Sequence, residues 1–367
     1  MNLYRSILRP LLFRLSAETA HRMVNGICAF PAIDRLNAIV HRGIDDPTLR
    51  VQLGHLELPN PVGLAAGWDK NAHCMRTLET LGFGALEIGS VSARASIGNP
   101  KPRLFRLPVD KAIVVNYGLP NEGADVIAHR IRVHTPRVPL GVNIVKTNDG
   151  PEASATADEI YDDYLQSILR LHEHASYLVL NLSCPNSKGD ADFFAAADSL
   201  TPLLERMSDL DLRAPVFLKV APDPSPRAIE RWIEEADPHP FVHGFLFNLP
   251  GGKPHSLQTL TPRSELERLP GAVSGRPVAN LLEECLGEMY RRMPRERFIL
   301  IGGGGIFTAD DAYQRIRHGA SFVQLYSALI YEGPGVVRKI IRGLSERLRR
   351  DGLDSIRDAV GLHWRSA

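Results

Sequence analysis

The part of this sequence best suited to chemistry is a single thiol between two amides. Cys184 lies in the run Asn181-Leu182-Ser183-Cys184-Pro185-Asn186, directly after the apolar residues 177–180, where a strand is expected to end. A thiol can take up or release a proton, and the flanking amides can donate and accept hydrogen bonds, which is typical of a proton-transfer group among substrate-orienting contacts. A lone cysteine is more often a buried packing residue. The chemical interpretation therefore depends on the elements that surround Cys184.

The overall composition excludes several classes of function. The chain has 367 residues, of which 44% are hydrophobic and 23% charged, as in ordinary globular proteins. Its formal net charge of +1 argues against a nucleic-acid-binding surface. The cysteines at positions 28, 74, 184 and 285 form no Cys-x-x-Cys pair, so no metal site, iron–sulfur cluster or disulfide framework is predicted. No uncharged apolar run reaches the roughly 18 residues that a membrane span requires, so we expect no transmembrane segment.

Short apolar runs alternate with helical patterns from residue 61 onward. Eight runs are predicted to be buried strands: 61–66, 85–89, 140–145, 177–182, 216–220, 244–247, 298–301 and 322–325. Helical periodicity lies between most of them, for example at 156–171, 227–235, 281–292 and 309–316. Apolar strands that alternate with helices are typical of parallel sheets covered on both faces. The predicted fold is therefore α/β, a (β/α)8 TIM barrel over residues 48–367.

Residues 1–42 are predicted to form a small N-terminal helical extension. Leu3, Ile7 and Leu11 recur every four residues, and Pro10 is expected to kink or restart the helix. Ser16 is a suitable N-cap for a second helix. Up to residue 30, four arginines stand against one glutamate. A basic amphipathic helix pair can lie on a membrane surface or pack on its own domain, and the pattern favours neither. Residues 41–47 are predicted to be a linker.

Polar residues stand at the carboxyl ends of six successive predicted strands. They are Lys70, Ser90, Asn143 with Lys146, Asn181 with Cys184, Lys219, and Asn248. In a TIM barrel these ends meet at the face that carries active sites, and the loops after strands seven and eight commonly hold a phosphate. Here those loops begin with Gly302-Gly303-Gly304-Gly305 and with Tyr326-Ser327. We therefore expect a phosphorylated cofactor with a reactive ring. Flavin mononucleotide (FMN) fits, with Lys219 or Lys70 placed to stabilise negative charge on the reduced ring.

With these motifs in place, the chain resembles the dihydroorotate dehydrogenases, specifically the membrane-associated, quinone-linked class. The resemblance extends over essentially the whole chain. It rests on Ala65-Ala66-Gly67-Trp68-Asp69-Lys70, Gly82-Phe83-Gly84, Glu87-Ile88-Gly89-Ser90, Lys101-Pro102-Arg103-Leu104-Phe105-Arg106-Leu107, Lys219-Val220-Ala221-Pro222-Asp223, Ser274-Gly275-Arg276-Pro277 and Gly319-Ala320-Ser321-Phe322-Val323-Gln324-Leu325-Tyr326-Ser327. The segment Glu18-Thr19-Ala20-His21-Arg22 also resembles that class, which implies that the helical pair forms a quinone tunnel at a membrane surface.

The resemblance implies a reaction and a set of site residues. Dihydroorotate would lose a hydride from C6 to flavin N5 while Cys184 removes the C5 proton, and a membrane quinone would reoxidise the flavin, as a step of pyrimidine biosynthesis. The substrate would contact Lys70, Tyr117, Asn181, Asn186 and Asn248, and the quinone would lie near His21 and Arg106. FMN would be held by Ala66, Gly67, Lys70, Gly89, Ser90, Asn143, Asn181, Lys219, Ser274, Gly275, Gly304, Gly305, Tyr326 and Ser327. The protein would be peripheral to the cytoplasmic face of a membrane, which the N-terminal helices contact.

Three residues depart from the pattern of that class. Cys184 stands where quinone-linked members usually carry serine, and an unperturbed thiol has a pKa of roughly 8.5, which makes it usable as a base nearer neutral pH. Val115 and Leu249 stand where the pattern has an asparagine and a threonine, so two polar contacts to the substrate are absent. Either a neighbour such as Asn116 compensates, or the pocket accepts a different, less polar substrate.

Two further hypotheses are disfavoured. A flavin-binding membrane-surface protein without turnover would have no use for Cys184. A role on nucleic acid conflicts with the near-zero net charge. Gly189 would permit the loop 186–194 to act as a lid, which the sequence alone leaves open.

Overall fold

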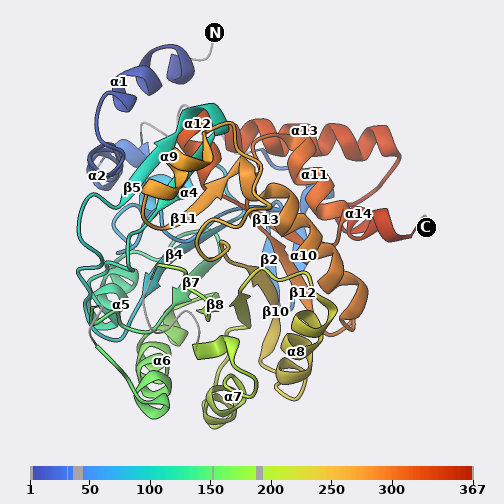
Figure 1. Cartoon of the computed structure of the whole chain (residues 1–367). Coiled ribbons are helices and arrows are strands. Elements are labelled where there is room, and N and C mark those ends of the chain that lie inside the picture. Colours follow the sequence, from blue (N-terminus) through green and yellow to red (C-terminus); the bar gives the residue numbers. More distant parts are fainter. Residues whose placement is uncertain (1–2, 31, 36–43, 151–152, 187–192, 366–367) are drawn as a thin grey trace.

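Eight parallel strands close into a barrel at the centre of the molecule (Figure 1). The computed structural model describes residues 3–30, 32–35, 44–150, 153–186 and 193–365, so most of the predicted lid and the boundary near residue 42 lie outside the described residues. The strands follow one another around the barrel as β3 (Val62–Leu64), β4 (Ala85–Val91), β7 (Leu140–Ile144), β8 (Tyr177–Asn181), β9 (Val216–Val220), β10 (Val242–Phe247), β12 (Ile299–Gly302) and β13 (Phe322–Leu325). Pairing of β13 with β3 closes the barrel. Each strand corresponds to one of the eight predicted strands, and the predicted barrel is confirmed.

Helices surround the barrel on its outside (Figure 1). They are α4 (Met75–Glu79), α5 (Ala124–Val133), α6 (Ala157–Leu171), α7 (Thr201–Ser208), α8 (Pro226–Ala236), α10 (Ala279–Arg292), α11 (Ala309–Arg317) and α13 (Val336–Asp351), with the shorter α9 (Arg263–Arg268), α12 (Ser327–Glu332) and α14 (Ile356–Ala359). The four helices predicted as examples are confirmed as α6, α8, α10 and α11. The start of α6 is fixed by reciprocal hydrogen bonds between Thr156 and Glu159, which satisfy N–H groups that the helix itself cannot pair.

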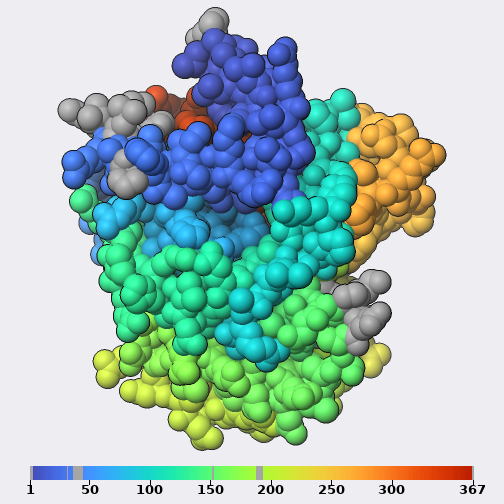
Figure 2. Space-filling model, turned by 90° about the vertical axis from the view of Figure 1, so that its left-hand side faces the viewer, coloured from blue at the N-terminus to red at the C-terminus, as the bar shows by residue number. Residues whose placement is uncertain are grey.

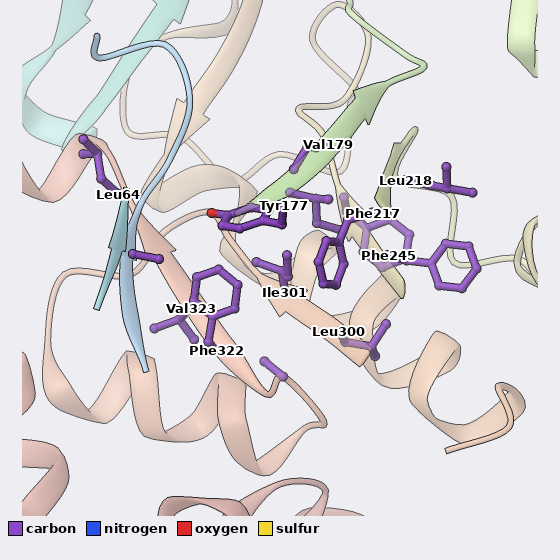
Figure 3. Packing of buried hydrophobic residues seen from close by; sticks show 14 of the residues in the cluster. Leu64, Tyr177, Val179, Phe217, Leu218, Phe245, Leu300, Ile301, Phe322 and Val323 are labelled. Carbon is purple, nitrogen blue, oxygen red and sulfur yellow. The ribbon is translucent and has the colours of Figure 1, made fainter. Parts of the chain in front are cut away.

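Aromatic side chains fill the barrel near the amino-terminal ends of its strands. Figure 3 shows Tyr177 from β8, Phe217 from β9 and Phe322 from β13 directed into the barrel interior. The rings of Tyr177 and Phe217 meet edge to face, with centroids 5.8 Å apart. Gly141 on β7 leaves room for this arrangement, since a Cβ there would stand 2.2 Å from Tyr177 Cζ. The floor of the barrel is therefore packed, and a ligand must bind at the carboxyl ends of the strands.

An antiparallel sheet that the sequence did not predict stands beside the barrel mouth (Figure 1). Its strands are β5 (Leu104–Leu107), β6 (Ala112–Val115) and β11 (Ala272–Gly275), in the order β11-β6-β5. Val115 pairs with Leu104 on one side and Ala272 on the other. The sheet thus joins segments that are far apart in the sequence. A separate hairpin is formed by β1 (Val51–Leu53) and β2 (Leu56–Leu58).

The N-terminal segment is helical and rests on the barrel. A π-helical turn (Tyr4–Leu8) leads into α1 (Arg9–Phe13), with Pro10 in its first turn, and α2 (Ala17–Ala29) begins after Ser16, whose side chain accepts a hydrogen bond from the Thr19 N–H. The predicted restart and N-cap are confirmed. The segment is anchored because Tyr4 donates to Ile330 O at 2.7 Å and Arg9 donates to Tyr331 O at 2.9 Å. Figure 2 shows these helices projecting at one end of the molecule. Among the described residues, no helix is both long and apolar enough to cross a membrane.

Gly141→Ala should lower the free energy of unfolding by about 1–3 kcal/mol, because the added methyl group overlaps the Tyr177 ring. Chemical denaturation followed by circular dichroism measures this difference. Gly251→Ala is the matched control, since a Cβ at Gly251 meets no heavy atom within 4 Å. Adding Tyr177→Leu to Gly141→Ala should cost less than the sum of the two single changes. A strictly additive pair would contradict the packing described here.

Candidate active site

The carboxyl ends of the strands surround one cavity that gathers most of the predicted site residues. Those that line it are Ala66, Gly67, Lys70, Gly89, Ser90, Tyr117, Cys184, Asn186, Lys219, Asn248, Ser274, Gly304, Gly305, Tyr326 and Ser327. Asn143 and Asn181 lie one layer behind the wall, each hydrogen-bonded to Ser90 Oγ, and Gly275 follows the lining residue Ser274. The barrel therefore brings side chains from positions 66 to 327 around one space.

Cys184 borders this cavity with 8% of its surface exposed. β8 ends three residues earlier, and Asn248 at the end of β10 donates from Nδ2 to Ser183 O at 3.0 Å, which fixes the backbone next to the thiol. Asn186 also lines the cavity, and its buried Oδ1 accepts no hydrogen bond from the described residues. Leaving a buried acceptor unpaired is costly. This oxygen is therefore suited to an N–H group of a ligand.

Part of the cavity wall is apolar. Val115 on β6 and Leu249 after β10 both border the cavity, together with Leu119 and Pro120. Asn116 does not line it, and its Oδ1 instead accepts a hydrogen bond from Asn99 Nδ2 at 3.1 Å. The oxygen of the Asn116 side chain is thus engaged within the protein, and the side chains at 115 and 249 add no polar group to the cavity wall.

The glycine loop after β12 lines the cavity with backbone groups. Gly304 and Gly305 have φ angles of +76° and +71°, which residues other than glycine rarely adopt. A Cβ would stand 2.2 Å from Leu282 at the first position and 2.5 Å from Ala279 at the second. Within the described residues, neither N–H donates to a protein acceptor. Consecutive free N–H groups in such a turn, lining a cavity, are arranged to hold a phosphate.

Two lysines add positive charge to the cavity wall. Lys219 comes from β9, and Lys70 follows β3. Lys70 Nζ donates to Gly67 O at 2.7 Å and lies 4.1 Å from the centre of the Tyr117 ring. Burial lowers the pKa of the Lys70 ammonium to about 8, and the nearby Arg103 contributes to that fall. Lys70 is thus a cation that an anionic ligand would stabilise.

Two residues at this site, Glu87 and Gln324, were not predicted from the sequence to have a role. Gln324 on β13 lines the cavity, while Glu87 on β4 lies behind it and is completely buried. Gln324 Nε2 donates to Glu87 Oε2 at 2.5 Å. A charged residue inside an otherwise apolar strand is a signal that could have identified Glu87, because a buried charge requires partners.

A second, apolar cavity lies between the N-terminal helices and the barrel. It is lined by Tyr4, Leu12, Phe13, Ala17, Ala20, His21, Val24, Trp68, Leu104, Arg106, Ile113, Tyr326 and Ile330. Both residues predicted to lie near a quinone, His21 and Arg106, are in this wall. Arg106 donates to Leu12 O at 3.2 Å and to Leu15 O at 2.6 Å, so it holds the end of α1 over the cavity.

Comparison with known proteins agrees with this geometry. The family model for dihydroorotate dehydrogenase matches residues 48–348. The chain is 38% identical over 366 residues to a dihydroorotate dehydrogenase (quinone) of Gloeobacter violaceus, covering 98% of this chain and 99% of that one. It is 39% identical over 361 residues to one of Mycobacterium sp. (strain KMS), covering 98% of each. A crystal structure of DHODH from Eimeria tenella in complex with ferulenol aligns with a TM-score of 0.79 at 32% identity, covering 95% of this chain and 96% of that one. The chain therefore belongs to the dihydroorotate dehydrogenase family, in its quinone-linked class.

Proposed function

We propose that this protein is an FMN-dependent, quinone-linked dehydrogenase that oxidises dihydroorotate to orotate with Cys184 as the base. The observation that carries the proposal is the contact between two cavities. The cavity that holds Cys184 and Lys219 shares two wall residues, Ile113 and Tyr326, with the apolar cavity under the N-terminal helices. A flat ring seated at the shared wall is accessible to one reactant from each side. The names of the relatives support the same pair of reactants.

The residues that line the cavity fit both the phosphate and the ring of FMN. The free N–H groups of Gly304 and Gly305 suit the phosphate, and Ser274 and Ser327, whose Oγ atoms are 3.5 Å apart, stand on neighbouring segments. At the other end, the Lys219 ammonium suits a ring that gains negative charge. When bound, FMN would supply the hydride acceptor and then deliver the electrons to the quinone.

The chain's own residues would position the substrate and remove its proton. Cys184, nearly excluded from solvent, would take the C5 proton onto its sulfur, while the hydride leaves from C6 on the face toward the cofactor. Asn186 Oδ1 would accept a hydrogen bond from a ring N–H of the substrate. The Lys70 ammonium would pair with its carboxylate, which favours the charged lysine.

The apolar cavity would bind the quinone. His21 contributes the face of its ring, because both of its nitrogens have protein partners: Trp68 O lies 3.0 Å from Nε2 and Tyr117 Oη lies 3.1 Å from Nδ1. Burial lowers the pKa of the His21 imidazole to about 3, and the nearby Lys70 adds to that fall. The ring is therefore neutral at physiological pH, which suits an apolar ligand.

The N-terminal helices would place this cavity against a membrane, and the proposed location is the cytoplasmic face. Large apolar side chains of the first helical turns face outward, with Leu3, Leu8 and Leu11 between 48% and 60% exposed. Two arginines of the same segment contact the rest of the protein, since Arg5 pairs with Glu332 at 3.5 Å and Arg9 donates to Tyr331 O at 2.9 Å. A membrane-soluble quinone would then enter directly from the lipid.

A second candidate function keeps the barrel, the flavin and the quinone and replaces dihydroorotate by a less polar substrate. The observation that favours it is the apolar part of the wall, where Val115 and Leu249 border the cavity that Cys184 also lines. A polar ring placed against these side chains would leave hydrogen-bonding groups unpaired, at a cost of about 1–3 kcal/mol each.

Anaerobic mixing of the purified protein with dihydroorotate should bleach the oxidised-flavin absorbance, and Cys184→Ala should slow this bleaching by about 100-fold or more, because a positioned base contributes at least that factor. Cys184→Ser, which keeps a group able to take the proton, is the matched variant and should retain more activity than alanine. A flavin that stays oxidised at millimolar dihydroorotate would favour the second candidate function. Protein that takes up no FMN would contradict both.

Val24→Trp should fill the apolar cavity and lower quinone-dependent turnover by about tenfold or more, which corresponds to a loss of about 1.4 kcal/mol of binding. Bleaching by dihydroorotate should be unchanged, since Val24 does not border the first cavity. The neighbouring Met23→Trp is the control, because Met23 is 43% exposed and does not line the cavity. Equal losses in both half-reactions would place the quinone elsewhere.

Stability should fall in acid because of His21. Its pKa is about 3 in the folded protein and about 6.5 in the unfolded chain, so between these values the unfolded chain binds more protons. The free energy of unfolding should therefore decrease as pH falls from 6.5 to 3, by up to about 1.4 kcal/mol per unit. His21→Gln should flatten this slope in denaturation measured across that window, whereas the exposed His55→Gln should leave it unchanged. Parallel slopes in all three proteins would refute the assignment.

A further inference from the structure

Glu87 lies at the centre of a polar cluster behind the cavity wall. Its side chain comes from β4 and is 0% exposed. One carboxylate oxygen accepts a hydrogen bond from Asn143 Nδ2 at 2.9 Å and the other accepts one from Gln324 Nε2 at 2.5 Å. Burial raises the pKa of the Glu87 carboxyl, and the Lys219 ammonium and the two amide donors oppose that rise. Because both oxygens accept and a cation is near, the cluster is built around a carboxylate.

A directional chain of hydrogen bonds ends on this carboxylate. Asn248 Nδ2 donates to Asn181 Oδ1 at 2.8 Å, and Asn181 Nδ2 donates to Ser90 Oγ at 3.2 Å. Ser90 Oγ donates in turn to Asn143 Oδ1 at 2.5 Å, which leaves Asn143 Nδ2 for Glu87. The hydrogen-bond chain thus runs from the residue after β10 through β8, β4 and β7 and returns to β4.

The direction of this hydrogen-bond chain decides whether donors or acceptors of the wall residues face a ligand. A side-chain amide can be turned around, so that its donor and acceptor exchange places. If one amide turned, two acceptors or two donors would face each other, and the next member would have to turn as well. Ser90, Asn248 and Gln324 line the cavity. A fixed acceptor at the end of the chain therefore fixes their orientation.

We propose that Glu87 is a positioning residue for the dehydrogenase site: its carboxylate sets the direction of the amide chain and balances the charge of Lys219. Glu87 does not border the cavity, so it acts through Asn143, Gln324 and Lys219. The inference rests on the proposed function for the identity of the ring beside Lys219. With the carboxylate removed, an unbalanced cation would remain near that ring. Such a cation stabilises the reduced, more negative form of a flavin.

Glu87→Gln tests both parts of the proposal, since it keeps the shape, removes the charge and replaces one acceptor by a donor. In dye-equilibrated titrations of the FMN-loaded protein, the ratio of reduced to oxidised flavin at a fixed potential should rise about tenfold, which is about 30 mV for a two-electron couple. FMN should also dissociate more readily, because Asn143 and Ser90 lose their fixed orientation. An unchanged ratio and an unchanged dissociation constant would overturn the proposal.

The double variant Glu87→Gln with Asn143→Asp moves the carboxylate one step along the chain. The carboxylate introduced at position 143 would accept from Ser90 and from the new amide at position 87, so both the charge and the direction are restored. The ratio of reduced to oxidised flavin should return toward that of the parent. Glu57→Gln is the control, because it removes the charge of an exposed residue on β2. It should leave the ratio of reduced to oxidised flavin unchanged.

The outcomes separate this inference from the function on which it rests. A parent protein that binds no FMN would contradict the proposed function itself. A parent that binds FMN, with variants that behave like it, would overturn the role of Glu87 alone. If Glu87→Gln does not fold, a folded double variant with the parent ratio still supports the proposal. Failure of both variants to fold would show that folding requires a carboxylate at position 87 itself, and would overturn a role limited to positioning.

Discussion

Closure of the parallel ladder is the constraint on which the rest of the structure depends. Because all eight strands run in one direction, their carboxyl ends meet at one rim, and side chains from Ala66 to Ser327 border a single cavity there. The opposite end is filled by rings such as Tyr177 and Phe217. A polar side chain at the rim must therefore face a ligand or find a partner behind the wall. The hydrogen-bond chain that ends on Glu87 satisfies this requirement for the amides that do not face the cavity.

The sequence predicted this rim because its signals are local. A buried parallel strand is a continuous apolar run, and a polar residue at its end is visible without knowledge of its neighbours. The sheet of β5, β6 and β11 could not be predicted in this way, since Val115 pairs with Ala272 across a long stretch of sequence. The sequence also did not show which of these residues reach the cavity: Asn143 and Asn181 stand at strand ends, yet both lie behind the wall, where they bond to Ser90 Oγ. Alternation along a strand gives the face of a side chain and not the partner that it finds there.

Different parts of the fold contribute to the cavity wall. Lys219 belongs to β9, a barrel strand whose position is fixed by pairing on both edges. Val115 belongs to the added sheet, as Ser274 does, and Leu249 belongs to the loop after β10, so residues can change there without disturbing the barrel ladder. Adjacent residues of this segment face opposite ways: Val115 borders the cavity, whereas the amide of Asn116 is directed to Asn99.

The N-terminal helices complete the second cavity only while they are docked on the barrel. A buried ion pair, Glu18 with Arg103 at 3.1 Å, joins α2 to the segment before β5. Such a pair contributes little net stability after its desolvation, but a wrong position of α2 would leave both charges buried and unpaired. The pair therefore specifies where α2 lies, and with it the position of His21 over Trp68 and Tyr117. The apolar residues of the first turns remain outside this contact. The same helices can thus present an apolar surface outward while their polar contacts fix the part of the second cavity's wall that they contribute.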